Sequence, residues 1–150
     1  MGGWIMLLLT LKRIDRIRGL IGIASAPDFT KDLMWDLFDE NQKQILRSEG
    51  IYDLSSEYSD TPYPITMDLI EDGNKNLVLH EKIKIDVPVI LLHGKKDEDV
   101  PFSISEKLAK QLTSHDVEVN LIEDADHRMS TDENLQFLAK KIEELLAKTS

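Results

Sequence analysis

The chain has 150 residues, of which 41% are hydrophobic, and a formal net charge of −10 at pH 7. This length and apolar content suffice for one domain with a buried core, whereas the acidic charge disfavours nucleic acid or an anionic membrane as partner. Because the sequence has no cysteine, it excludes disulfides, thiolate nucleophiles and zinc–thiolate sites, and we expect a cytoplasmic protein.

The amino-terminal part of the chain predicts one helix and one strand. Residues 2–12 are apolar on nearly every side, which indicates a buried helix. The apolar part of this segment is too short to cross a bilayer, so we expect no membrane span. Residues 19–24 form a short apolar run followed by Ser25, Pro27 and Asp28, which is typical of a strand covered on both faces.

The middle of the chain carries weaker signals. Residues 29–47 show two short helical patterns. Residues 51–63 show no periodicity and predict a long loop. Residues 64–72 predict a helix, with Pro64 at its start and Gly73 at its end.

Two strands are expected in the second half of the chain. Residues 88–94 are apolar and run into a glycine turn, so they predict a doubly buried strand. Apolar and polar side chains alternate in residues 117–121, which predicts a half-buried strand. Capping-box patterns at residues 103–106 (SISE) and 130–133 (STDE) predict the starts of two helices. The apolar stripe of the last helix consists of Leu135, Leu138, Ile142 and Leu145.

Strand and helix signals alternate along the chain, which predicts an α/β fold with a parallel sheet. We expect three strands and about five helices. The strand at residues 19–24 would lie at the edge of this thin sheet, where an uncharged strand invites pairing with another chain. We therefore expect the sheet to be incomplete on its amino-terminal side.

Asp97 and His127 are the candidate catalytic residues. Asp97 comes just after the predicted strand 88–94, and His127 comes just after the strand 117–121. Because ligands and catalytic groups gather at the carboxyl ends of parallel strands, the two side chains can come within hydrogen-bond reach. The carboxylate would then fix the imidazole tautomer and stabilise the imidazolium formed during proton transfer.

These residues also have ordinary structural explanations. Asp97 stands in a charged cluster typical of a solvated turn, and a lone histidine after a strand is more often structural than catalytic. His80 and His115 fit a surface role, and His93 fits a role in fixing the turn. The four histidines lack the spacing of a metal site, so we expect neither a metal nor a cofactor.

The two loops resemble those that carry the acid and the histidine in α/β-hydrolases, whose triad runs serine, acid, histidine. HGKKDEDVP (residues 93–101) is similar to the acid-bearing turn of that superfamily, and ADHR (residues 125–128) is similar to its histidine loop. The stretches GGWIML, GLIGIASAPD and LMW further resemble the small serine esterases that include mitochondrial acyl-protein thioesterases and acyl-glucuronide esterases. The resemblance spans essentially the whole chain but only the later part of the superfamily's fold.

The resemblance implies a partial α/β-hydrolase domain over residues 1–150, with the last three parallel strands, flanking helices and a small lid at about residues 29–66. It also implies that Met1 follows the nucleophilic serine of a G-x-S-x-G motif, with Gly2 as its final glycine. The backbone N–H of Met1 would then be an oxyanion-hole donor. A frayed start without this ancestry is the alternative explanation of MGGW.

The resemblance further implies a serine hydrolase of acyl esters or thioesters whose serine precedes this sequence, so we expect the chain alone to be inactive. Met34 and Trp35 are candidate substrate-binding residues in the lid, although such a stripe at helical spacing is more often core packing. Four serines stand outside any G-x-S-x-G context and are not expected to replace the nucleophile: Ser25, Ser103, Ser105 and Ser130.

Two alternatives remain beside the hydrolase interpretation. The chain could be a non-catalytic remnant or a binding module that pairs through its sheet edge with a separate amino-terminal half or with a second copy of itself. Its start could also be misplaced, so that Met1 is an internal residue of a complete hydrolase. If the chain is part of an enzyme, its binding partner is a small acyl ester or thioester substrate. If it is a binding module, its partner is another protein chain.

Overall fold

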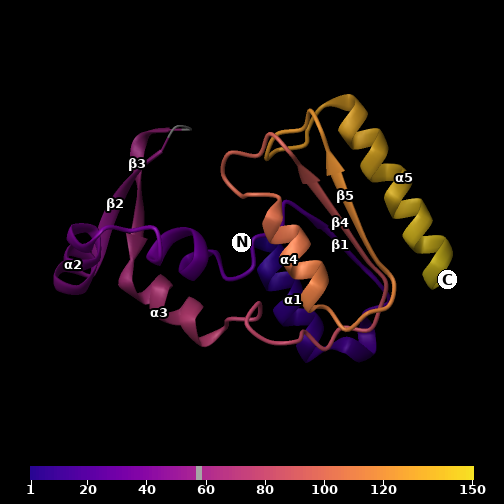
Figure 1. Cartoon of the computed structure of the whole chain (residues 1–150), viewed down its shortest axis with the longest axis horizontal. Coiled ribbons are helices and arrows are strands. Elements are labelled where there is room, and N and C mark those ends of the chain that lie inside the picture. The colour runs from indigo at the N-terminus through magenta and orange to yellow at the C-terminus, as the bar shows by residue number, and fades with distance from the viewer. Residues whose placement is uncertain (57–58) are drawn as a thin grey trace. The chain divides into compact units, whose positions relative to one another are not determined.

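The computed structural model describes residues 1–56 and 59–150. The chain divides into two compact units (Figure 1). Unit 1 consists of Met1–Pro27 and Val78–Ser150, and unit 2 consists of Asp28–Leu77. Each unit is described by itself below.

The centre of unit 1 is a parallel sheet of three strands in the order β1-β4-β5. Its strands are β1 (Leu20–Ile23), β4 (Val89–Gly94) and β5 (Val117–Ile122). Every residue of β4 is buried because this strand lies between the other two and is covered on both faces. The prediction of an α/β fold with three parallel strands is therefore confirmed.

Helices cover both faces of this sheet (Figure 1). Helices α1 (Gly2–Lys12) and α4 (Ser103–Gln111) lie on one face, and α5 (Asp132–Thr149) lies on the other. A short 3-10 helix, η1 (Ile14–Arg16), follows α1. On the α5 face the buried cluster comprises Ile90, Leu92, Ala125, Met129 and Leu145.

Helix α1 forms as predicted but is not buried throughout. Trp4, Leu7 and Thr10 are buried, whereas Ile5 and Leu9 are 55% and 54% exposed. A helix that is apolar all round can bury only the side that packs on its sheet, and the remaining apolar side faces outward. The prediction for β1 is wrong in the same way, because Ile23 at its end is 40% exposed.

Unit 2 is built from helices and one antiparallel hairpin. The prediction of a loop at residues 51–63 is wrong, because the described residues of this stretch lie in the two strands of the hairpin. Residues 57 and 58 lie outside the described residues. Cross-strand pairs such as Tyr52 with Ile65 stabilise the strands, since Ile65 and its neighbours bury their apolar faces. The elements are the π-helix η2 (Thr30–Trp35), α2 (Glu40–Glu49), β2 (Ile51–Ser56), β3 (Ser59–Thr66) and α3 (Met67–Lys75).

Several predicted helix starts are displaced. Pro64 lies in β3 rather than at a helix start, and the side chain of Thr66 caps α3 by accepting a hydrogen bond from the N–H of Leu69. Ser103 is the first residue of α4 and not the residue before it. The N-cap position is occupied by Phe102, which makes no side-chain cap hydrogen bond. Thr131, not Ser130, caps α5. A capping box in the sequence locates the start of a helix only to within a residue or two.

The last helix buries less of its predicted stripe than expected. Leu145 is buried and Leu138 is partly buried against the sheet, but Leu135 and Ile142 are exposed. None of the helices in the described part of the chain combines the length and the apolar character needed to cross a membrane.

The buried centre of β4 offers a direct test of the packing. Replacing Leu91, which is fully buried, with Ala should lower the free energy of unfolding by about 2–5 kcal/mol, because a cavity remains in the core. Urea unfolding followed by circular dichroism measures this loss. The control L135A, at a side chain that is 49% exposed, should change stability by less than about 1 kcal/mol. Equal losses in the two variants would contradict the described core.

Candidate active site

The turn after β4 holds a buried carboxylate in a fixed position. The side chain of Asp97 is fully buried, and its Oδ1 accepts hydrogen bonds from the backbone N–H groups of Asp99 (3.0 Å) and Val100 (2.8 Å). Two backbone donors on one oxygen orient the carboxyl plane and leave Oδ2 for side chains. The turn therefore presents Oδ2 as an acceptor at the carboxyl end of the sheet.

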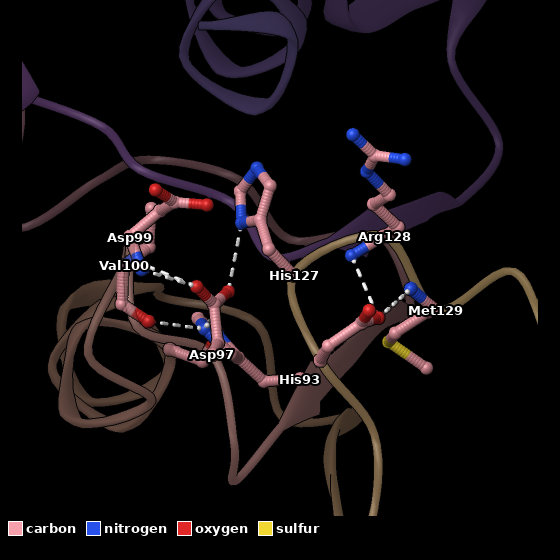
Figure 2. Close-up of polar contacts among 9 residues, drawn as sticks. His93, Asp97, Asp99, Val100, His127, Arg128 and Met129 are labelled. Carbon is pink, nitrogen blue, oxygen red and sulfur yellow. Dashed lines mark hydrogen bonds and ion pairs between the residues drawn. The ribbon is translucent and has the colours of Figure 1, made fainter. Parts of the chain in front are cut away.

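His127 reaches this oxygen from the loop after β5 (Figure 2). Its Nδ1 lies 2.8 Å from Asp97 Oδ2, so Nδ1 carries the proton and donates it. The opposite ring nitrogen, Nε2, is directed away from Asp97 and has no hydrogen-bond partner within residues 1–56 and 59–150. With 42% of its side chain exposed, His127 leaves Nε2 accessible to a group outside this pair.

The loop that carries His127 has its own internal support. Asp126 Oδ1 accepts hydrogen bonds from the backbone N–H groups of Arg128 and Met129, each at 3.0 Å. Met129 has a positive φ of 46°, and its side chain is buried in the cluster under α5. These contacts hold the backbone on the carboxyl side of His127 (Figure 2).

The acid turn and the histidine loop are joined by backbone hydrogen bonds. The N–H of Lys95 donates to the carbonyl of Ile122 (2.9 Å), and the N–H of Lys96 donates to the carbonyl of Ala125 (3.0 Å). Gly94 permits this approach: a Cβ at this position would lie 2.6 Å from both the carbonyl carbon of Ala125 and the carbonyl oxygen of Asp126. The two loops therefore pack against each other at a residue where any Cβ would clash with the backbone.

Two surface ion pairs reinforce the same junction. The Nζ of Lys95 lies 2.7 Å from Glu123, and the Nζ of Lys96 lies 2.5 Å from Asp124. The hydrogen bond from Lys96 holds the pKa of the Asp124 carboxyl below its usual value and raises the pKa of Lys96. Because these pairs are exposed, they add little to stability. The charged residues around Asp97, which the sequence presents as a solvated turn, thus connect the two loops.

A second histidine contacts the same carboxylate. His93 is fully buried at the end of β4, and its Nε2 lies 3.1 Å from Asp97 Oδ2 and 2.9 Å from the carbonyl oxygen of Val100. Its Nδ1 lies 2.7 Å from Oγ of Ser105 on α4. The sequence indicated a role for His93 in the turn, but Ser105 carries no signal in the sequence that predicts this contact.

The start of α1 lies at the same end of the sheet. A Cβ on Gly3 would meet the side chain of Ser25, the second residue after β1, and a Cβ on Gly22 would come within 3.5 Å of Met6. The first turn of α1 therefore packs beside the carboxyl end of β1. Met1, the predicted oxyanion donor, is the residue before this helix and is 58% exposed.

The predicted substrate residues lie in unit 2. Met34 and Trp35 belong to η2 and pack against a buried cluster that includes Phe38. The guanidinium of Arg47 lies 5.2 Å from the centre of a Trp35 ring. These contacts favour the core-packing alternative for part of each side chain. The role of Met34 and Trp35 in binding stays a prediction.

The other candidate serines have contacts of their own. Ser25 is buried with its Oγ unpartnered among the described residues, Ser105 bonds to His93, and Ser103 and Ser130 are exposed. None of these contacts joins a serine to His127.

Asp97, Asp99 and His127 also hold their potential ligand atoms within 4.8 Å of one another. Three such groups could face a cation. However, Asp97 Oδ1 and Oδ2 and His127 Nδ1 already hydrogen-bond within the protein, which favours proton transfer over metal binding. The expectation of no metal stays a prediction.

A parallel sheet with helices on both faces, and an acid–histidine pair after its neighbouring strands, defines the chain as an α/β-hydrolase. Its structure is similar to a putative hydrolase from Agrobacterium vitis S4, with a TM-score of 0.91, 36% identity, and coverage of 97% of this chain and 58% of that one. It is also similar to mouse alpha/beta hydrolase domain-containing protein 10, with a TM-score of 0.88, 31% identity, and coverage of 99% of this chain and 59% of that one.

The chain belongs to the prolyl oligopeptidase family (Peptidase_S9), whose sequence profile matches residues 37–149. It is 33% identical over 151 aligned positions to the human mitochondrial palmitoyl-protein thioesterase ABHD10, covering 100% of this chain and 49% of that protein. The chain is thus an α/β-hydrolase close to thioesterases, as the resemblance implied. It spans about half the length of the curated relatives it matches.

Gly94 provides a test of the junction between the two loops. The added methyl group of G94A would clash first with the carbonyl oxygen of Ala125 and then with that of Asp126. It should therefore displace the histidine loop, lower stability by about 1–3 kcal/mol and lengthen the Asp97–His127 hydrogen bond. Urea unfolding and the downfield NMR resonance of the His127 Nδ1 proton measure the two effects. The control G2A should preserve both, because a Cβ at Gly2 would meet nothing within 4 Å. An unchanged Nδ1 proton resonance in G94A would contradict the account.

Proposed function

We propose that this chain supplies the acid and the histidine of a serine hydrolase that acts on acyl esters or thioesters. One observation carries the proposal: Nδ1 of His127 donates to the buried Asp97 carboxylate at 2.8 Å while Nε2 is left for another group. This arrangement fits a general base that acts on a nucleophile from a different segment.

In the proposed reaction, Nε2 of His127 takes the proton from a serine hydroxyl as the oxygen attacks the acyl carbon. The same nitrogen then gives the proton to the departing alcohol or thiol, so that an acyl-enzyme forms and the leaving group departs neutral. Water completes the cycle by the same two proton transfers. Asp97 holds the imidazole in its Nδ1–H tautomer throughout and stabilises the transient imidazolium.

We propose that the nucleophilic serine lies outside these 150 residues. The G-x-S-x-G resemblance supports a serine immediately before Met1, and the packing of the first turn of α1 beside the carboxyl end of β1 supports the same location. The N–H of Met1 would then stabilise the oxyanion. A long acyl chain as substrate is supported by the name of the human relative, a palmitoyl-protein thioesterase, with Met34 and Trp35 as its candidate contacts.

The test restores a serine-bearing segment. A chimera that joins the amino-terminal half of the mouse relative, up to and including its serine, to Met1 should hydrolyse a p-nitrophenyl acyl ester and an acyl thioester. Substitution D97N should lower kcat by about 10⁴-fold, because the tautomer of the base is lost. H127A should lower kcat by at least about 10⁴-fold, because the base itself is lost. Steady-state kinetics with both substrates gives these values.

The control is H115A, at an exposed histidine that precedes β5 and so lies at the opposite end of the sheet from Asp97, which should retain full activity. A fluorophosphonate probe should label the chimera on the added serine and should leave the 150-residue chain unlabelled. A label on the chain alone, or a fully active H127A chimera, would refute the proposal.

A second candidate function is a binding module that pairs through its sheet edge. In the part of the chain that the structure describes, β1 pairs with β4 only, and exposed Ile5, Leu9 and Ile23 lie on α1 and β1. Exposed apolar side chains beside a strand with one unpaired edge favour association with another chain.

Light scattering after size-exclusion chromatography separates this candidate from the first. The module predicts a dimer of the 150-residue chain, and replacing Ile23 with Lys at the edge should yield the monomer. A compact monomer of the wild-type chain would exclude self-pairing.

A further inference from the structure

His93 and Ser105 form a buried polar pair beside the proposed catalytic dyad. His93 is fully buried and Ser105 is 1% exposed, so neither can exchange its partner for water. The contact joins the end of β4 to α4 across 12 residues of sequence. Polar groups removed from water in this way are retained only when their hydrogen bonds are satisfied.

The partners of the ring determine its tautomer. Nε2 of His93 is surrounded by two acceptors, the Asp97 carboxylate at 3.1 Å and the Val100 carbonyl at 2.9 Å, so Nε2 must carry a proton. Nδ1 faces the Ser105 hydroxyl at 2.7 Å, which can donate to it. The neutral Nε2–H tautomer therefore satisfies every group in the network.

Asp97 Oδ2 consequently accepts from two imidazoles, at 2.8 Å from His127 and 3.1 Å from His93. The His127 side chain is 42% exposed, whereas the His93 side chain is fully buried. The hydrogen bond from His93 fixes the position of Oδ2 when His127 moves or changes its protonation. It also stabilises the negative charge of the carboxylate. The two backbone donors on Oδ1 act on the other oxygen only.

We propose that His93, held in its tautomer by Ser105, is a positioning residue for Asp97, and this proposal rests on the proposed function of the Asp97–His127 pair. The chain of hydrogen bonds runs from the Ser105 hydroxyl through His93 to Asp97 and then to His127. His93 does not touch the reacting atoms. It acts by fixing the oxygen to which the general base is bonded.

The first experiment reads the hydrogen bond directly in the 150-residue chain. Long-range ¹H–¹⁵N NMR of the histidine rings should show His93 as the Nε2–H tautomer and His127 as the Nδ1–H tautomer. In H93L the His127 Nδ1 proton should move and broaden, because Asp97 Oδ2 has lost its buried donor. In H93Q, whose amide N–H can replace Nε2–H, the wild-type signal should be largely restored.

The second experiment measures kinetics in the chimera described above. H93L should lower kcat by about 10- to 100-fold with KM nearly unchanged, as expected for a residue that supports a catalytic group. H93Q should recover much of that loss, and S105A should show a smaller loss in the same direction. The matched control is S103A, an exposed serine on the same helix, which should behave as wild type.

The outcomes separate the two proposals. An inactive wild-type chimera would count against the proposed function, whereas the NMR signatures of the chain would still decide the role of His93. If H93L unfolds, S105A carries the same test, because it should shift the His127 Nδ1 proton whereas H93Q should largely keep the wild-type signal. A His127 Nδ1 proton that is identical in wild type, S105A and every folded His93 variant would overturn the positioning role, as would a His93 ring found as the Nδ1–H tautomer.

Discussion

The candidate site depends on one buried carboxylate. A carboxylate taken out of water is tolerated only when donors surround it, and Asp97 accepts two backbone N–H groups on Oδ1 and two imidazoles on Oδ2. The acid turn, β4 and the histidine loop must therefore adopt their positions together. Gly94 makes this possible because it lets the two loops touch.

The fold determines where Asp97 and His127 lie, and their hydrogen bond determines which proton transfer they can carry out. Adjacent parallel strands β4 and β5 bring their following loops to one edge, so that residues 30 apart in sequence become hydrogen-bond partners. The same sheet serves many chemistries, so the reaction class rests on the Asp97–His127 geometry rather than on the topology. The proposed acyl substrates rest on the similarity to ABHD10 and not on the fold.

Much of unit 1 could be predicted from the sequence because its signals are local. The apolar run of β4 and the order of acid and histidine indicated both the strands and the pair. The hairpin of unit 2 was missed because Tyr52 and Ile65 stabilise it only across strands, which no single stretch of sequence reveals. The Ser105–His93 contact was missed for the same reason, since it joins a helix to a strand through a buried pair of polar side chains.

The proposed function requires that this chain bring the acid and the base to a serine outside its 150 residues. The most direct measurement treats the native cell with a fluorophosphonate probe, captures the protein through α5 and locates the modified residue by mass spectrometry. We expect a modified serine in a G-x-S-x-G sequence outside residues 1–150, and we expect no modification when His127 is replaced by Ala. A probe on a serine within residues 1–150, or labelling that survives the loss of His127, would contradict it.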